Sequence, residues 1–91
     1  MPSYSHWTLI YDRDFTKALK KLDNPTKRRI MDSLDRLAQS PTPKAHCKAL
    51  TGEFSGLWRY RIGNYRVILH LDQGELTIIA VDAGHRSKIY R

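Results

Sequence analysis

The sequence is poor in cysteine: Cys47 is the only one, which excludes an internal disulfide. It also lacks any apolar run near the roughly 18 residues that a membrane-spanning helix requires. Residues 1–6 show no basic stretch followed by an apolar one, so they do not resemble a signal peptide. Together these absences predict a protein of the reducing cytoplasm with no membrane partner.

Acidic residues are also scarce. Nine Asp and Glu stand against sixteen Lys and Arg, which gives a formal net charge of +7 and a pI near 9.9. Such a surplus attracts polyanions, because the displacement of counterions from phosphates contributes affinity that does not depend on sequence. The alternative is a solvated basic surface without a partner, and we favour polyanion binding.

The chain is short. With 91 residues we expect one domain that spans residues 1–91. A domain of this size has no room for a deep cavity, so an active site would be a shallow surface. Such a surface suits a polymer substrate better than a small metabolite.

The first third of the chain predicts a strand and then a helix. Residues Trp7–Tyr11 are β-branched or aromatic, as in a short strand. Apolar residues then recur at helical spacing, with Asp12 or Asp14 as the cap and residues 23–25 as the stop. This stripe comprises Phe15, Ala18, Leu19 and Leu22.

A second helix follows at once, with Asn24 as its N-cap and Pro25 as its first residue. Its apolar stripe comprises Ile30, Met31, Leu34, Leu37 and Ala38. The two helices are predicted to form an antiparallel hairpin. Residues 40–43 end the second helix, and residues 41–56 are predicted to form a long connection, a feature that is often functional in a small domain.

The last third is typical of strands. Strands are predicted over Leu57–Ile62, Tyr65–Leu71 and Leu76–Val81. Residues 82–84 are predicted to break the last of these, and Arg86–Arg91 is a candidate edge strand. The order β-α-α-β-β-β predicts an α+β fold, in which the helical hairpin packs on one face of a mostly antiparallel sheet of four or five strands.

Arginines gather in the predicted hairpin of residues 57–71. If every second residue from position 58 to 62 points toward the helices, Arg59 and Arg61 point out of the opposite face. The turn at residues 63–64 then brings Arg66 close to Arg61. Three guanidinium groups on one face repel each other unless an anion lies between them, and phosphate matches their fork geometry. The alternative is that each arginine pairs with a nearby carboxylate, of which the candidates are Glu53, Asp72 and Glu75.

The C-terminal segment adds further candidates. Arg86 is a fourth arginine near one sheet edge. His85 can act as a general acid or base near neutral pH, or it is simply an exposed loop histidine. Tyr90 can stack on a nucleobase, or it closes the core as a buried tyrosine.

Four segments of the sequence together carry a resemblance to a known family. They are Tyr11–Phe15, Lys48–Leu50 with Gly52, Leu57–Val67 and Gly84–Tyr90. The string Trp-Arg-x-Arg-x-Gly-x-Tyr-Arg, followed by Gly-His-Arg and a tyrosine, is specific only in combination. Over nearly its whole length the chain resembles the RelE family of the RelE/ParE toxin superfamily.

This resemblance implies a toxin of a type II toxin–antitoxin system that cleaves messenger RNA in the ribosomal A site, with neither a metal ion nor a cofactor. In that chemistry the ribose 2′-OH attacks the adjacent phosphate, which leaves a 2′,3′-cyclic phosphate and a 5′-hydroxyl. By analogy, Arg66 and Arg86 stabilise transition-state charge, and Tyr90 stacks on or orients the substrate. The family's catalytic positions fall on Arg59, Arg61, Arg66, Arg86 and Tyr90.

Two departures from the family pattern limit the analogy. The best-studied family pattern has lysines at the positions of Arg59 and Arg61, and an arginine stays protonated where a lysine can act as a base. We therefore interpret these two arginines as electrostatic clamps. Cys47 stands where some relatives have a catalytic glutamate, so that mechanism is not expected. The general base stays open, and the candidates are Lys48, His85 and Tyr90.

Two other functions stay open. The ParE-like branch shares the fold but poisons DNA gyrase, and a non-catalytic module would hold RNA through its phosphates alone. The arginines together with Tyr90 lead us to favour the nuclease.

The expected partners are the ribosome, messenger RNA and a separately encoded antitoxin. The antitoxin is expected to be acidic and partly disordered when free, because a small cationic domain suits an acidic amphipathic segment that folds on binding. DNA would be contacted only through the antitoxin.

Overall fold

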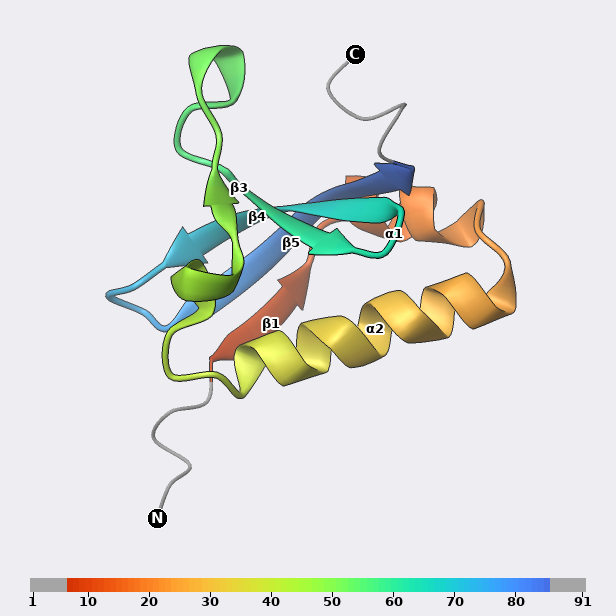
Figure 1. Ribbon diagram of the computed structural model, residues 1–91, viewed down its shortest axis with the longest axis horizontal. Coiled ribbons are helices and arrows are strands. Elements are labelled where there is room, and N and C mark those ends of the chain that lie inside the picture. The colour runs from red at the N-terminus through yellow and green to blue at the C-terminus, as the bar shows by residue number, and fades with distance from the viewer. Residues whose placement is uncertain (1–6, 86–91) are drawn as a thin grey trace.

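In the computed structural model, which describes residues 7–85, two helices lie on one face of a five-stranded sheet (Figure 1). The elements are β1 (Thr8–Tyr11), α1 (Arg13–Lys20), α2 (Asn24–Ala38), η2 (Pro43–His46), β2 (Lys48–Ala49), η3 (Gly52–Phe54), β3 (Trp58–Ile62), β4 (Tyr65–Asp72) and β5 (Thr77–His85). This order confirms the predicted α+β fold. The candidate strand over Arg86–Arg91 lies outside the described residues.

The sheet has the strand order β1-β5-β4-β3-β2. Its strands pair antiparallel, except that β1 runs parallel to β5. The chain therefore enters at one edge of the sheet and makes the helical hairpin. It then returns at the opposite edge and fills the middle with β3, β4 and β5.

The helices begin close to where the sequence predicts. Asp23, not Asn24, is the N-cap of α2, and its carboxylate accepts a hydrogen bond from the backbone N–H of Thr26 at 3.2 Å. Pro25 follows inside the first turn, where its missing N–H costs no hydrogen bond. Asp12 occupies the N-cap position of α1, but its side chain makes no capping bond.

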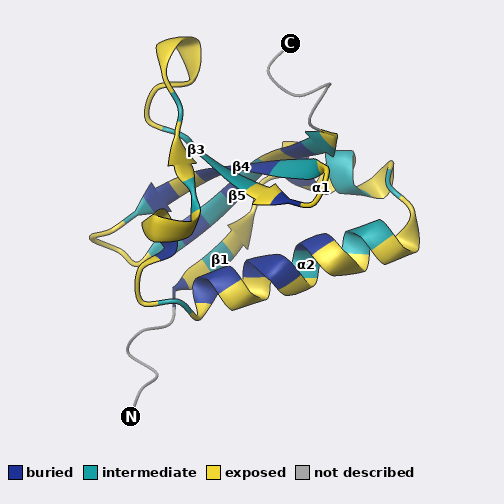
Figure 2. Ribbon diagram, in the orientation of Figure 1, coloured by how far each residue is buried: buried dark blue, intermediate teal, exposed yellow. Residues whose placement is uncertain are grey.

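The core lies between the helices and the sheet. Buried residues line the side of α2 that faces the sheet (Figure 2), as the apolar stripe predicts. The largest fully buried side chains come from both layers: Phe15, Ile30, Leu34, Pro43, Val67, Leu69 and Ile78. No helix within residues 7–85 is long and apolar enough to cross a membrane.

The connection over residues 41–56 is more ordered than predicted. It contains the single turns η2 and η3, and between them the two-residue strand β2, which pairs with the start of β3. The pairing places Lys48 opposite Arg59 and Ala49 opposite Trp58. A strand of two residues has too few side chains to leave a periodic signal in the sequence.

The prediction that the strand breaks at residues 82–84 is wrong, because β5 continues through them. Asp, Ala and Gly are weak strand formers, yet their pairing with β4 overrides that preference. The pairing shifts by one residue between Ile68 and Leu69, so that Ile68 lies opposite Asp82. Val81 is thereby left as an extra residue, which is a β-bulge.

The bulge changes which residues of β5 face the helices. Before it, Ile78 and Ala80 are buried, each with 0% of its surface exposed; after it, Ala83 is buried with 8% exposed. Burial thus passes from even to odd positions along the strand. Asp82 consequently points away from the helices, out of the open face of the sheet.

The turn between β3 and β4 depends on Gly63. This glycine has a φ of +59°, which suits the first central position of a two-residue hairpin turn. A Cβ added there would lie 2.8 Å from Nη2 of Arg29, which reaches the turn from α2. The positive φ favours glycine at this position, and the predicted turn at residues 63–64 is confirmed.

Candidate active site

The open face of the sheet carries four basic side chains. Arg61 lies directly opposite Arg66 across the β3–β4 hairpin, and Arg59 lies opposite Lys48 of β2. Directly opposed residues in an antiparallel pair project from the same face. Residues 58, 60 and 62 pack on the core, so the alternating arginines point away from the helices. We call this set, Lys48, Arg59, Arg61 and Arg66, the basic face.

The basic face brings like charges together. Two arginines directly opposite each other repel, and Arg61 and Arg66 form such a pair. Arg59 and Arg66 are half-buried, whereas Lys48 and Arg61 are exposed. Within residues 7–85, no ion pair joins Arg59 or Arg61 to Glu53, Asp72 or Glu75. Arg66 does make a further interaction.

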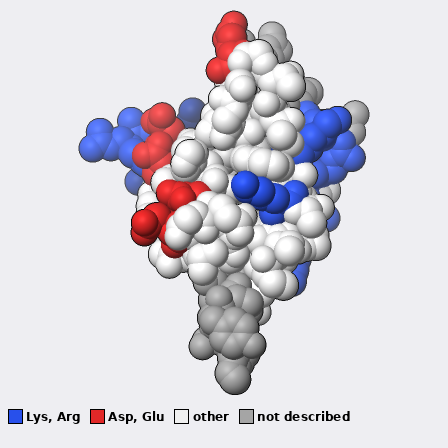
Figure 3. All heavy atoms as spheres, turned by 90° about the vertical axis from the view of Figure 1, so that its left-hand side faces the viewer, with Lys and Arg blue, Asp and Glu red and all other residues white. Residues whose placement is uncertain are grey.

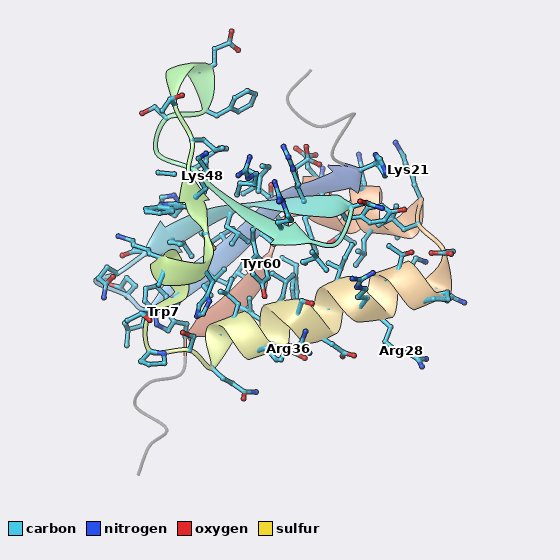
Figure 4. All side chains as sticks on the ribbon, viewed as in Figure 1. Trp7, Lys21, Arg28, Arg36, Lys48 and Tyr60 are labelled. Atoms are coloured by element: carbon cyan, nitrogen blue, oxygen red, sulfur yellow. The ribbon has the colours of Figure 1, made fainter. Side chains whose placement is uncertain are left out.

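A hydrogen-bond network fixes the strand that carries two of these arginines. Tyr60, between Arg59 and Arg61, points to the other side of the sheet, where its hydroxyl donates to the backbone carbonyl of Ser33 in α2 at 3.1 Å. Arg36 in turn donates to the Ser33 hydroxyl at 3.2 Å. Figure 4 shows Tyr60 between the sheet and α2, with Lys48 on the far side of the sheet from that helix. The helix thus anchors β3 from below while the arginines remain on the open face.

On part of the molecular surface, basic side chains lie apart from acidic ones (Figure 3). In Figure 3, Lys and Arg side chains form a group at one side of the visible face with no Asp or Glu beside it. Such segregation concentrates positive potential instead of cancelling it. Within residues 7–85, no three His, Cys, Asp or Glu side chains are grouped to hold a metal ion.

The structure does not bring His85 to the basic face. His85 lies opposite Tyr65, and the two rings meet edge to face with centroids 5.5 Å apart. Tyr65 packs against the core, so this pair projects toward the helix side of the sheet. Gly84, the residue before His85, lies opposite Arg66. The predicted site residues Arg86 and Tyr90 lie outside the described residues.

The open face also carries Asp82, which was not a candidate in the sequence. Asp82 lies opposite Ile68, which in turn lies opposite Arg59, so Lys48, Arg59, Ile68 and Asp82 form one row across four strands. The sequence hides this placement because regular alternation from Ile78 and Ala80 would turn Asp82 toward the helices. The bulge at Val81 arises from the pairing of β5 with β4, so it cannot be predicted from the local sequence pattern.

Cys47 lies just before β2, where it is partly buried against the core. Burial raises the pKa of its thiol from 9.0 to about 11. At pH 8 the native thiol should therefore react with a disulfide reagent on the order of 100-fold more slowly than the thiol of the urea-unfolded chain. Stopped-flow kinetics of the two states measure this ratio. Equal rates would contradict the burial of Cys47.

The fold has close counterparts among solved structures. The toxin–antitoxin complex RelBE2 from Mycobacterium tuberculosis matches with a TM-score of 0.82 and 21% sequence identity, over 91% of this chain and 94% of that chain. The archaeal RelE–RelB complex from Pyrococcus horikoshii OT3 matches with a TM-score of 0.71 and 25% identity, over 91% and 98%. The isolated Escherichia coli RelE toxin matches with a TM-score of 0.69 and 19% identity, over 92% and 90%. The fold is therefore that of the RelE/ParE toxin superfamily.

The sequence also matches a family directly. Residues 9–90 match the family described as the ParE toxin of the type II toxin–antitoxin system parDE. Because this match covers nearly the whole chain, the chain belongs to that family and is a toxin of a type II system within the RelE/ParE superfamily. No curated protein matches the chain.

Proposed function

We propose that this toxin is a metal-independent endoribonuclease that cuts messenger RNA in the ribosomal A site. The observation that supports this most strongly is the basic face, where Arg59, Arg61, Arg66 and Lys48 project together from an open sheet surface. Guanidinium forks bind phosphate bidentately, and an open surface admits a polymer. A phosphate between Arg61 and Arg66 would accept hydrogen bonds from both guanidinium groups.

The reaction requires three kinds of catalytic group: a base for the 2′-OH, cations for the phosphorane and an acid for the leaving 5′ oxygen. Arg59 and Arg61 supply fixed positive charge at the phosphate. Arg66, in the middle of the sheet and half-buried, stabilises the charge that develops in the transition state. We assign Arg86 to the same task and Tyr90 to stacking on a base.

An acidic antitoxin is the partner we propose for the free toxin. Several solved structures with this fold are complexes with a RelB antitoxin, among them that from Methanococcus jannaschii, with a TM-score of 0.66. A net charge of +7 favours an acidic segment that folds on binding. By covering the basic face such a segment would silence the toxin.

Gyrase poisoning is the second candidate function, and one observation favours it. The family whose model matches residues 9–90 is described by the ParE toxin of parDE. The RelE and ParE branches share one fold, so the fold does not separate the two activities. The basic face favours the nuclease, because phosphate chemistry uses such a face and inhibition of a protein target does not require it.

Two assays run side by side test the proposal. Wild type and Arg86→Ala are induced in bacteria, and a reporter transcript is analysed by primer extension; we expect growth arrest with in-frame cuts for wild type only. Purified wild type is also added to a gyrase supercoiling reaction, where we expect no inhibition. Supercoiling inhibition without RNA cuts would establish the ParE-like activity. RNA binding without cuts, even on translating ribosomes, would establish a non-catalytic module.

A further inference from the structure

The open face of the sheet holds a carboxylate beside the basic side chains. Asp82 lies in the same cross-strand row as Arg59 and Lys48, and it is diagonal to Arg66, whose direct partner is Gly84. Diagonal neighbours on adjacent strands have Cα atoms only about 7–8 Å apart. Asp82 is therefore within side-chain reach of a phosphate held by these arginines.

Asp72 shares the open face but lies too far away for the same task. It follows Arg66 by six residues along β4, which corresponds to roughly 20 Å at about 3.3 Å per residue. Its Oδ1 also accepts a hydrogen bond from the backbone N–H of Glu75 at 3.1 Å, within the β4–β5 turn. Of the two carboxylates in the described strands, Asp72 and Asp82, Asp82 is the one that lies next to the basic face.

The β-bulge is what gives Asp82 this position. The extra residue Val81 shifts the alternation of β5, so that Asp82 projects outward and Ala83 packs inward. Bulges are frequent next to active sites because they re-aim a single side chain. Without the shift, the carboxylate would project into the apolar layer under the helices, where an unpaired charge is strongly unfavourable.

One hydrogen bond orients the side chain of Asp82 and leaves acceptor sites on its carboxylate. Its Oδ1 accepts a hydrogen bond from the backbone N–H of Ala83 at 2.8 Å, and the residue is exposed. A carboxylate has about four acceptor sites, so among residues 7–85 Oδ2 stays available to an incoming hydroxyl. A fixed, accessible carboxylate beside a phosphate-binding face has the geometry of a general base.

We propose that Asp82 is the general base of the reaction and Lys48 the general acid; this rests on the proposed endoribonuclease function. Asp82 takes the proton of the 2′-OH as the O2′–P bond forms. The P–O5′ bond breaks on the opposite side of phosphorus, and the Lys48 ammonium gives a proton to O5′. The products are a 2′,3′-cyclic phosphate, a 5′-hydroxyl, a protonated Asp82 and a neutral Lys48, so atoms and charge balance.

The row arrangement fits an in-line displacement. Lys48 and Asp82 stand at its two ends, with Arg59 and Ile68 between them. Three strand spacings separate their backbones, on the order of 14 Å, which leaves room for a ribose–phosphate unit over the middle of the row. This assignment fills the role that Arg59 and Arg61 cannot play, since an arginine stays protonated.

If Asp82 only balances charge, the expected effect of its removal on the cleavage rate is the opposite. If Asp82 only moderates the repulsion among the arginines, its removal leaves a more cationic face that binds RNA more tightly. Cleavage would then stay constant or become faster. If Asp82 is the base, its removal leaves binding intact or tighter while cleavage falls.

The test compares Asp82→Asn with Asp35→Asn, which removes an equal charge from an exposed site on α2. Single-turnover cleavage on programmed ribosomes is measured together with ribosome affinity. We expect Asp82→Asn to cleave about 10²–10⁴-fold more slowly with affinity kept or raised, and Asp35→Asn to match wild type. Asp82→Glu should recover part of the lost rate because it restores a carboxylate.

Each other outcome overturns the assignment. Asp82→Asn that cleaves at the wild-type rate, or faster, would make Asp82 a charge-balancing residue. If Asp82→Asn loses both cleavage and ribosome affinity, and Asp82→Glu does too, the role is structural. If the wild type cuts no RNA on ribosomes, the proposed function is refuted. This outcome is distinct from failure of the Asp82 assignment, in which the wild type still cuts RNA.

Discussion

Replacement of Arg66 by alanine is expected to lower the single-turnover rate of RNA cleavage by about 10²–10³-fold. Arg66 sits in the central strand β4, directly opposite Arg61, and it is half-buried. A cation in such a place is already oriented and partly desolvated, so it stabilises developing charge without reorganising. Its loss removes an interaction that matters most in the transition state, and the rate should fall more than the affinity.

The matched control is Arg28→Ala, which removes an exposed arginine from the outer side of α2. Both variants lose one positive charge, so any general weakening of ribosome binding should be shared. Arg66→Lys keeps the charge but loses the fork, and we expect it to recover only part of the rate. Equal cleavage by Arg66→Ala and Arg28→Ala would show that the basic face is not catalytic.

Much of the fold follows from local periodicity. The stripe that contains Ile30 and Leu34 has a spacing that only a helix satisfies, and the observed α2 buries that stripe. The alternation from residue 58 to 62 and the Gly63 turn likewise predict a hairpin, and this local geometry is enough to bring Arg61 opposite Arg66. Three members of the basic face could therefore be placed from the sequence.

What the sequence misses depends on pairing between distant segments. The strand β2, the parallel pairing of β1 with β5, and the bulge at Val81 are set by neighbours that local patterns do not contain. The bulge has the largest consequence, because one extra residue exchanges the faces of Asp82 and His85 relative to regular alternation. The sequence offers His85 as an acid or base by its residue type, whereas the structure places Asp82 beside the arginines.

Replacement of Leu34 by alanine is expected to reduce the free energy of unfolding by about 2–5 kcal/mol. Leu34 has 0% of its surface exposed and lies on the side of α2 that faces the sheet. The loss is large because the cavity would form between two packed layers that cannot collapse independently. Domains of this kind have a total stability of roughly 5–15 kcal/mol, so a substantial part of it would disappear.

Urea denaturation of the free toxin measures this loss, with Ile10→Ala as the control because Ile10 has 46% of its surface exposed. We expect the midpoint of Leu34→Ala to fall well below that of Ile10→Ala, which should stay near wild type. A bound antitoxin should raise both midpoints, since a ligand that binds only the folded state stabilises it by mass action. If Leu34→Ala unfolds at the wild-type midpoint, α2 does not pack on the sheet through Leu34. The hydrogen bond from Tyr60 to the Ser33 carbonyl, which depends on that packing, would then not hold β3 below the arginines.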